Sequence, residues 1–398
     1  GLKLNNFSIA NLLKKNKEHR GFLPIGDGET MSLNAQTNGK YYQSYGLQYA
    51  TNWFGGKRPI QFTLGANFSK STDVNTSYYS RSYMQNYYNY MYGVGNYNYN
   101  NYENYLDPDK YIQIWGFYAG WGKRLRWPDD YFQLSVQLSY QRYILKNWRY
   151  FLIMSNGTAN NLSLNISLNR SSTDNQLYPR TGSEFSASLS ITPPWSKFDK
   201  KDYKNLANDR LSATYQQEQQ EKYRWVEYHK WKFKARTFTA LSSGSKCFVL
   251  MTRVEFGLLG SYNRYKKSPF ETFYMGGDGM SGYSSSYAQE TIGLRGYDNG
   301  QLTQRGEGYA YDRMTLELRY PFLLGNTTVY GLGFVEAGNA WTETSKFNPF
   351  DMKRSAGLGV RIYLPMVGMM GIDWAYGFDK VFGKKGGSQF HFVLGQEF

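Results

Sequence analysis

The chain has 398 residues, of which 18% are aromatic, with 41 glycines, one cysteine and a formal net charge of +15 at pH 7. Cys247 alone excludes a disulfide framework, and no paired Cys/His spacing suggests a metal site. The basic residues are scattered over 14–20, 230–236 and 382–387, so we interpret them as solvated loops and a polar interior and expect no nucleic-acid binding. No run approaches the roughly 18 apolar residues that a spanning helix requires.

Several segments alternate apolar and polar residues with a period of two. The clearest cover 132–140, 162–169 and 231–239, and in the last of these one face carries Lys232, Lys234 and Arg236. About fifteen segments of roughly ten residues, with no convincing helix between them, are typical of a transmembrane antiparallel β-barrel. A sheet can span lipid only if it closes, because every backbone amide must be paired. We therefore predict an all-β fold of that class.

The connections between these segments differ in length. The short ones are 126–130, 242–246, 323–328 and 365–368, the long ones are 72–109, 193–223 and 264–308, and 342–353 and 380–387 are intermediate. Outer-membrane barrels have short periplasmic turns and longer outside loops, so we expect 264–308 to be extracellular. Within 204–222 a short surface helix is expected. The Tyr/Asn-rich stretch 87–105 is interpreted as a surface loop.

Two later strands contain acidic residues. In "RMTLELRYPF" (313–322) Met314, Leu316 and Leu318 form an apolar face, so Glu317 is expected to point inward. In "YGLGFVEAG" (330–338) Glu336 shares a face with Phe334, but the alternation leaves open which face is the inner one.

Four segments together resemble the BamA family, the central barrel of the outer-membrane protein assembly machine of Gram-negative bacteria. They are "YPRTGSEF" (178–185), "SPFETFYMGGDG" (268–279), "LRGY" (294–297) and "GFVEAGNAW" (333–341). The resemblance covers nearly the whole chain. It implies a large extracellular loop that folds into the barrel, with about sixteen strands in the family.

The resemblance also implies roles for particular residues. The loop-lock motif Leu294, Arg295, Gly296 and Tyr297 would meet acidic residues of the inner wall. The expected partners on that wall, with the face of Glu336 assigned to the interior by the family, are Glu317, Phe334, Glu336 and Gly338. A guanidinium between buried carboxylates forms charge-assisted bonds. The sequence departs from the family in three places. Glu336 replaces the family's usual Asp, and Tyr297 replaces a common Phe. The segment between "GGDG" and "LRGY" is longer than expected.

The C-terminal segment "FHFVLGQEF" (390–398) resembles the β-signal by which outer-membrane barrels are recognised. Its residues, which would also form the edge of a lateral gate, are Phe390, Phe392, Leu394, Gly395 and Phe398. By the same resemblance, 1–10 corresponds to the family's second strand. We therefore expect residues 1–398 to be one barrel domain, without the periplasmic POTRA domains and the first strand. An unpaired edge is a template for strand addition.

The function implied is insertion of outer-membrane β-barrel proteins at that gate, in the outer membrane and without a cofactor, metal or catalytic residue. The expected partners are unfolded barrel clients, periplasmic chaperones, accessory lipoproteins and outer-membrane lipid. An enzyme is disfavoured because His19, His229 and His391 have no partner in a recognisable nucleophile motif. The alternatives are a TamA-like protein or a two-partner secretion transporter of the same superfamily, or a passive porin.

Overall fold

The structure is a computed structural model of the 398-residue chain. It describes residues 1–9, 11, 28–56, 59–74, 106–148, 154–206, 211–244, 246–279, 290–303, 307–365 and 368–395. The Tyr/Asn-rich stretch 87–105, His19, Phe398 and most of the long segment between "GGDG" and "LRGY" lie outside these ranges.

Strands dominate the described part of the chain. In it, fifteen strands follow one another in chain order in one sheet, from β1 to β10 and from β13 to β17. The first ten are β1 (Leu2–Phe7), β2 (Glu29–Asn38), β3 (Tyr42–Thr51), β4 (Ile60–Val74), β5 (Leu106–Arg124), β6 (Phe132–Lys146), β7 (Gly157–Ser171), β8 (Gly182–Ile191), β9 (His229–Ala240) and β10 (Val249–Gly260). The last five are β13 (Ala310–Leu323), β14 (Thr328–Trp341), β15 (Lys353–Leu364), β16 (Gly368–Val381) and β17 (Lys384–Leu394). The pairings from β8 to β17 are antiparallel.

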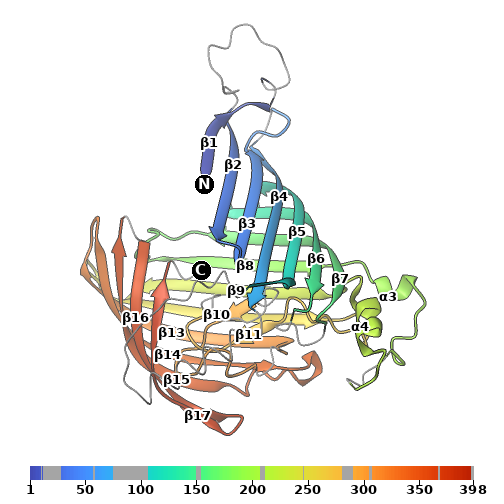
Figure 1. The fold of residues 1–398 in the computed structure, drawn as a ribbon. Helices are drawn as coiled ribbons and strands as arrows, with labels where there is room; N and C mark the ends of the chain where they lie inside the picture. The colour runs from blue at the N-terminus through green and yellow to red at the C-terminus, as the bar shows by residue number, and fades with distance from the viewer. Residues whose placement is uncertain are drawn as a thin grey trace, which may run out of the picture. The chain divides into compact units, whose positions relative to one another are not determined.

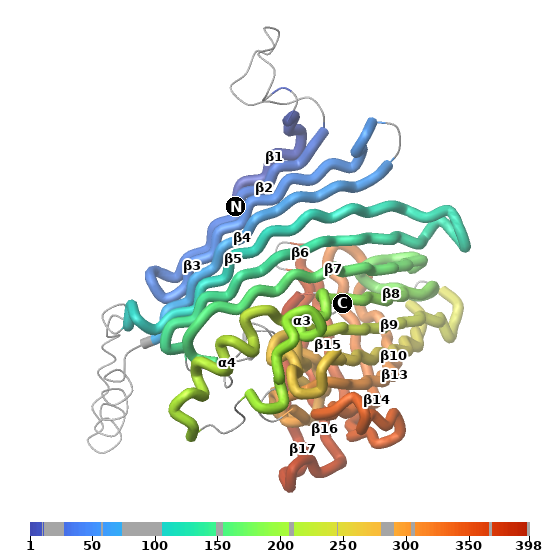
Figure 2. The backbone as a smooth tube through the Cα atoms, turned by 90° about the vertical axis from the view of Figure 1, so that its right-hand side faces the viewer, coloured from blue at the N-terminus to red at the C-terminus, as the bar shows by residue number. Residues whose placement is uncertain are grey.

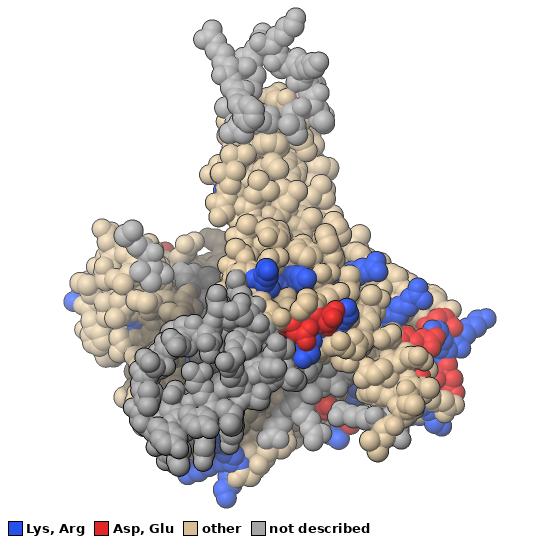
Figure 3. Space-filling view, viewed as in Figure 1, with Lys and Arg blue, Asp and Glu red and all other residues tan. Residues whose placement is uncertain are grey.

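The chain divides into two compact units. The first comprises 1–123, 136–164 and 195–226, and the second comprises 124–135, 165–194 and 227–398. In the first unit β1 to β5 lie side by side (Figure 2). Its surface over the early strands shows few charged side chains (Figure 3), and large apolar residues such as Leu33, Leu47 and Leu64 are exposed there.

The helices of the first unit are short. They are α3 (Trp195–Phe198) and α4 (Tyr215–Tyr223), and α4 overlaps the predicted helical segment 204–222 and ends one residue beyond it. Among the described residues, no helix has the length and apolar character needed to cross a membrane.

Strand β13 of the second unit exposes an apolar face and buries charged side chains on the opposite face. On β13 the exposed face carries Met314, Leu316 and Leu318, whereas Arg313 and Glu317 on the other face are buried. This arrangement is the inverse of that in a water-soluble sheet, where apolar residues face the core. We call the face with Arg313 and Glu317 the inner face.

The inner face of the second unit packs against the long connection between β10 and β13. This connection contains β11 (Phe273–Met275), which is labelled in Figure 1, and β12 (Glu290–Ile292). The two short strands pair in parallel with each other. Phe270, Phe273 and Leu294 of this segment are fully buried. The described parts of the long loop predicted at 264–308 are therefore folded onto the sheet rather than extended away from it.

One predicted connection is wrong in length. The segment 380–387 was expected to be of intermediate length, but β16 and β17 form a hairpin that turns at Phe382 and Gly383. Both residues have positive φ, 49° and 82°, as the tight two-residue turns of hairpins require. Another connection contains the short 3₁₀ helix η4 (Thr344–Lys346). The predicted absence of POTRA domains and of a first strand stays a prediction.

Candidate functional site

The loop-lock motif 294–297 follows β12 directly and is held by the glycine-rich segment after β11. The backbone N–H of Leu294 donates to the carbonyl of Gly277 at 3.0 Å, and Gly277 N–H donates to the Leu294 carbonyl at 3.1 Å. Gly276 N–H donates to the carbonyl of Ile292 at 2.9 Å. These bonds use the "GGDG" glycines at positive φ, where a side chain would be strained. The segment thus presents Arg295 to the inner face in one orientation.

Arg295 contacts three carboxylates on three strands. Its Nη2 lies 2.8 Å from both Glu317 Oε1 and Glu336 Oε1, and its Nη1 lies 3.0 Å from Asp373 Oδ2. Its backbone N–H also donates to Glu336 Oε2 at 3.0 Å. All four side chains are at most 3% exposed. Breaking a buried pair of this kind costs on the order of 3–5 kcal/mol, because a charge is left uncompensated.

Strand periodicity and register place these carboxylates. Glu317 on β13 lies opposite Phe334 on β14, and Glu336 lies opposite Thr315 on β13. On β16, Asp373 alternates with Ile372 and Trp374, which are exposed. Three carboxylates from strands that are close in the sheet therefore converge on the guanidinium.

Three further arginines of the wall share these carboxylates. Arg319 bonds Glu317 at 2.6 Å, Arg313 bonds Glu336 at 2.7 Å, and Arg361 grips both oxygens of Asp373 at 2.6 and 2.8 Å. A bidentate Arg–carboxylate pair fixes the geometry as well as the charge. Arg295 thus enters a prearranged network of buried charges, which we call the Arg295 network. Its members are Arg295, Arg313, Arg319, Arg361, Glu255, Glu317, Glu336 and Asp373.

Phe334 supplies the platform for the guanidinium. The Arg295 Cζ atom lies 3.4 Å from the centroid of the Phe334 ring, within the range of a cation–π contact. Gly338, on the same face of β14, leaves room for the loop, because a Cβ atom there would lie 2.8 Å from the Met275 methyl group. The four residues predicted to form the wall therefore all lie on the inner face, against the loop.

The next two residues of the motif reach β15, β16 and β17. Gly296 has φ +87°, and its N–H donates to Nε2 of His391 on β17 at 2.8 Å. The Tyr297 hydroxyl donates to the backbone carbonyl of Arg354 on β15 at 2.7 Å. Burial raises the pKa of this hydroxyl to about 12. The hydroxyl that distinguishes Tyr297 from the family's common Phe is thus used in a hydrogen bond.

Three of the five predicted β-signal residues lie on the other face of β17. Phe390, Phe392 and Leu394 are 66%, 58% and 68% exposed, while His391 and Val393 between them are buried. The N–H of Gly395 donates to the carbonyl of Met369 at 2.7 Å, which ends the pairing with β16. Within the sheet β17 is the last strand in the order from β1 to β17.

The turn motif "YPRTGSEF" has a structural role in the second unit. The Tyr178 hydroxyl lies 3.2 Å from the backbone carbonyl oxygens of both Cys247 and Arg319. Its ring packs against Tyr330 with centroids 5.2 Å apart. The turn before β8 is thereby anchored to the inner face near Arg319.

Sequence reasoning missed Asp373 and the role of His391. Asp373 sits in "GIDWAYGF", where the alternation with Ile372 and Trp374 was sufficient to place it on the inner face. Likewise, His391 alternates with Phe390 and Phe392. Within the described ranges no cluster of His, Cys, Asp and Glu is arranged to hold a metal ion.

Comparisons with known proteins agree with this architecture. Residues 25–398 match the family model described as the Omp85 superfamily domain. No curated protein sequence matches significantly. Among solved structures, BamA from Haemophilus ducreyi lacking POTRA domains 1–3 is similar, with a TM-score of 0.56, 15% identity, and coverage of 92% of this chain and 64% of that one.

Two further structures give lower scores. CdiB from Escherichia coli has a TM-score of 0.48 and 9% identity, and covers 92% of this chain and 55% of that chain. CdiB from Acinetobacter baumannii has a TM-score of 0.46 and 11% identity, with coverage of 92% and 53%. The chain thus spans less than two thirds of each of these three proteins. The superfamily match and the similarity to BamA confirm the predicted outer-membrane type of antiparallel β-barrel fold, and the chain belongs to the Omp85 superfamily.

Proposed function

We propose that the chain is a BamA-like insertase that promotes the folding and insertion of other β-barrel proteins in the bacterial outer membrane. The observation that carries the proposal is the contact set of Arg295 with Glu317, Glu336 and Asp373. A buried arginine that cross-links an inward-folded loop to three strands keeps the loop against the wall. This arrangement supports an assembly protein better than a passive porin, whose interior must stay open to solutes.

The contact between the loop and the last strand supports the same proposal. Gly296 binds His391 on β17, and the described pairing of β17 is with β16. A strand edge offers backbone donors and acceptors to an incoming strand. In the proposed mechanism a client strand pairs with the β17 edge, at a lateral gate between first and last strands. The apolar face of Phe390, Phe392 and Leu394 contacts lipid meanwhile.

The proposed activity requires no cofactor and no covalent step, so we propose a protein that is not an enzyme. Its partners would be unfolded barrel clients, delivered by periplasmic chaperones, with accessory lipoproteins and outer-membrane lipid. The free energy for insertion comes from pairing backbone groups of the client that would otherwise be unpaired in lipid, where each unpaired group costs several kcal/mol.

The test uses the full-length protein in liposomes and follows the folding of a chaperone-held barrel client. Wild type is compared with Arg295→Ala and with Arg354→Ala, a matched control in which the arginine is exposed and pairs with Asp379 outside the Arg295 network. We expect wild type and Arg354→Ala to accelerate client folding and Arg295→Ala to lose most of the gain. Steady ion conductance without client folding would favour a porin. Export of a soluble passenger without client folding would favour a two-partner secretion transporter, and folding of only a narrow set of clients a TamA-like protein.

A further inference from the structure

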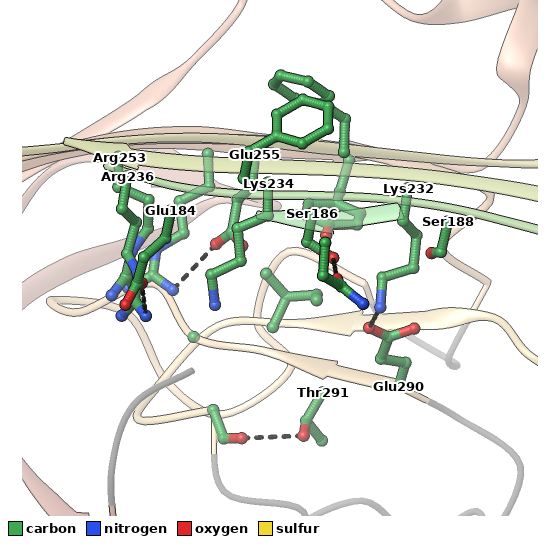
Figure 4. Close-up of a pocket in the computed structure, with 18 of the residues that line it drawn as sticks. Glu184, Ser186, Ser188, Lys232, Lys234, Arg236, Arg253, Glu255, Glu290 and Thr291 are labelled. Atoms are coloured by element: carbon green, nitrogen blue, oxygen red, sulfur yellow. Dashed lines mark hydrogen bonds and ion pairs between the residues drawn. The ribbon is translucent and has the colours of Figure 1, made fainter. Parts of the chain in front are cut away.

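A second group of charges lines a cavity that shares only Arg313 and Glu255 with the Arg295 network. The cavity has a volume of about 1070 Å³ and lies within the second unit, between the inner face of β8 to β10 and the segment of β12 (Figure 4). Its lining contains six basic and four acidic side chains, and two of the basic ones, Arg170 and Arg313, also pair with Asp129 and Glu336 outside the lining. The basic ones are Arg170, Lys232, Lys234, Arg236, Arg253 and Arg313, and the acidic ones are Glu184, Glu255, Asp278 and Glu290.

Three of the acidic groups are committed to particular bases. Glu290 pairs with Lys230 at 2.8 Å and with Lys232. Glu184 pairs with Arg236, and Glu255 pairs with Arg313 at 3.2 Å. Lys234, in contrast, forms no ion pair or hydrogen bond with any residue of the described ranges, and its ammonium group points into the cavity (Figure 4).

The register of the sheet concentrates positive charge around Lys234. On the paired strands β9 and β10, Arg236 lies directly opposite Arg253, and Lys234 lies opposite Glu255. Like charges directly opposite each other destabilise a sheet. Three cations thus meet on one patch of the wall, and the carboxylate opposite Lys234 bonds Arg313 instead. Such a patch is stabilised by an anion that bridges the three cations.

We propose that this cavity binds a phosphate group, carried on a polar molecule, through Lys234, Arg236 and Arg253. A phosphate monoester carries about −1.5 to −2 charges at pH 7 and offers three acceptor oxygens, one for each of the three cations. The N–H groups of a guanidinium can bond two phosphate oxygens at once, and an ammonium group adds a point charge. A carboxylate offers one charge and two oxygens, and one arginine satisfies it.

The size and polarity of the cavity favour a phosphate with a carrier over the free ion. Its volume lies just above the range of about 300–1,000 Å³ in which proteins hold small-molecule ligands. Ser186, Ser188 and Thr291 line it beside the cations and provide hydroxyl groups for a hydrated carrier. The proposal does not depend on the insertase function, since Lys234, Arg236 and Arg253 are not among the members of the Arg295 network named above.

The experiment is calorimetric titration of the purified full-length protein in detergent, at constant ionic strength. The probes are inorganic phosphate, glucose 1-phosphate, glucose and acetate. The variants are Lys234→Gln, Lys234→Arg and, as a control, Lys346→Gln, which removes an exposed lysine of η4. Because Lys234 has no ion-pair partner among the described residues, its replacement leaves none of their carboxylates unpaired, and the protein is expected to fold.

We expect both phosphates to bind wild type and Lys346→Gln alike, and glucose and acetate to bind neither. Lys234→Gln should weaken phosphate binding by about tenfold or more, the loss of one charge-assisted hydrogen bond, and Lys234→Arg should retain most of it. Tighter binding of glucose 1-phosphate than of phosphate identifies a phosphorylated carrier; tighter binding of phosphate rejects the carrier. The proposal is overturned if wild type binds neither phosphate, if acetate binds equally well, or if Lys234→Gln binds phosphate like wild type.

Discussion

Gly296 in the inward-folded loop donates its backbone N–H to Nε2 of His391 on the last strand, at 2.8 Å. Because Arg295 next to it is bound by carboxylates of β13, β14 and β16, two consecutive residues tie four strands together. His391 accepts this bond only through an unprotonated Nε2. The loop and the strand edge at β17 are therefore parts of one connected structure.

His391→Ala removes the acceptor of the Gly296 N–H. A buried donor left without a partner costs about 1–3 kcal/mol, so the contact between loop and β17 should open more often. The measurement is hydrogen–deuterium exchange of the segment 293–299, where we expect faster exchange than in wild type. His229→Ala serves as the control, since His229 bonds Trp231 on β9 and not the loop. Equal exchange in the two variants would show that the His391 bond does not hold the loop.

Arg295→Ala leaves the carboxylates Glu317, Glu336 and Asp373 with one cation fewer. Since these groups are buried, we expect a loss of about 3–5 kcal/mol in the free energy of unfolding. Thermal or urea unfolding in detergent measures it, with Arg354→Ala as the exposed counterpart that should change little. A loss of similar size in both variants would mean that the buried network adds no more to the free energy of unfolding than an exposed ion pair does.

Gly296→Ala tests the close approach of the loop to the wall. Gly296 has φ +87°, and an added Cβ atom would lie 2.8 Å from the backbone nitrogen of Gly377. The left-handed backbone alone costs a non-glycine residue roughly 1–2 kcal/mol, and the contact adds to that cost. Gly46→Ala is the matched control, because the nearest atom there is 3.9 Å away. Unfolding measurements should separate the two, and an unchanged Gly296→Ala would contradict the observed packing.

The lowered pKa of Glu290 leads us to predict how the stability of the fold depends on pH. Burial acts to raise the pKa of this loop carboxyl, but attraction to Lys230 and Lys232 outweighs it and the pKa is lowered. A folded-state pKa below the unfolded one gives stability that is present above the unfolded pKa of about 4.3 and is lost as pH falls through the folded value. Melting temperatures of wild type and Glu290→Gln should therefore differ at pH 7 and converge in acid. A difference that persists at the lowest pH would refute this assignment.

The alternation of apolar and polar residues was sufficient to predict most of the strands from the sequence alone. Met314, Leu316 and Leu318 predicted the inner position of Glu317, because in lipid the apolar face of a strand must point outward. On β14 the same rule left Glu336 undecided, since Gly331, Gly333 and other small residues blur the contrast between the faces. There the family resemblance, and not periodicity, gave the face that the structure shows.

Contacts between distant segments could not be predicted in this way. The convergence of Asp373 and His391 on 295–296 depends on where the loop lies in space, and no local pattern encodes that. The cluster of Lys234, Arg236 and Arg253 could not be predicted for the same reason. Periodicity placed Lys234 on the opposite face from Phe233, but only the register of β9 and β10 brings Arg253 beside it. Local rules give the face of a side chain, and tertiary packing gives its partner.

The Arg295 network also has a charge balance. It contains four guanidinium groups and four carboxylates, namely Arg295, Arg313, Arg319, Arg361, Glu255, Glu317, Glu336 and Asp373. The three wall arginines sit on strands, and Arg295 alone arrives with the loop. If the loop is withdrawn, the wall is left with one net negative charge in a sparsely hydrated place. Without the loop, the wall therefore attracts dissolved cations, which compete with Arg295 for the carboxylates. At low ionic strength few cations compete, so Arg295 binds the wall most strongly there.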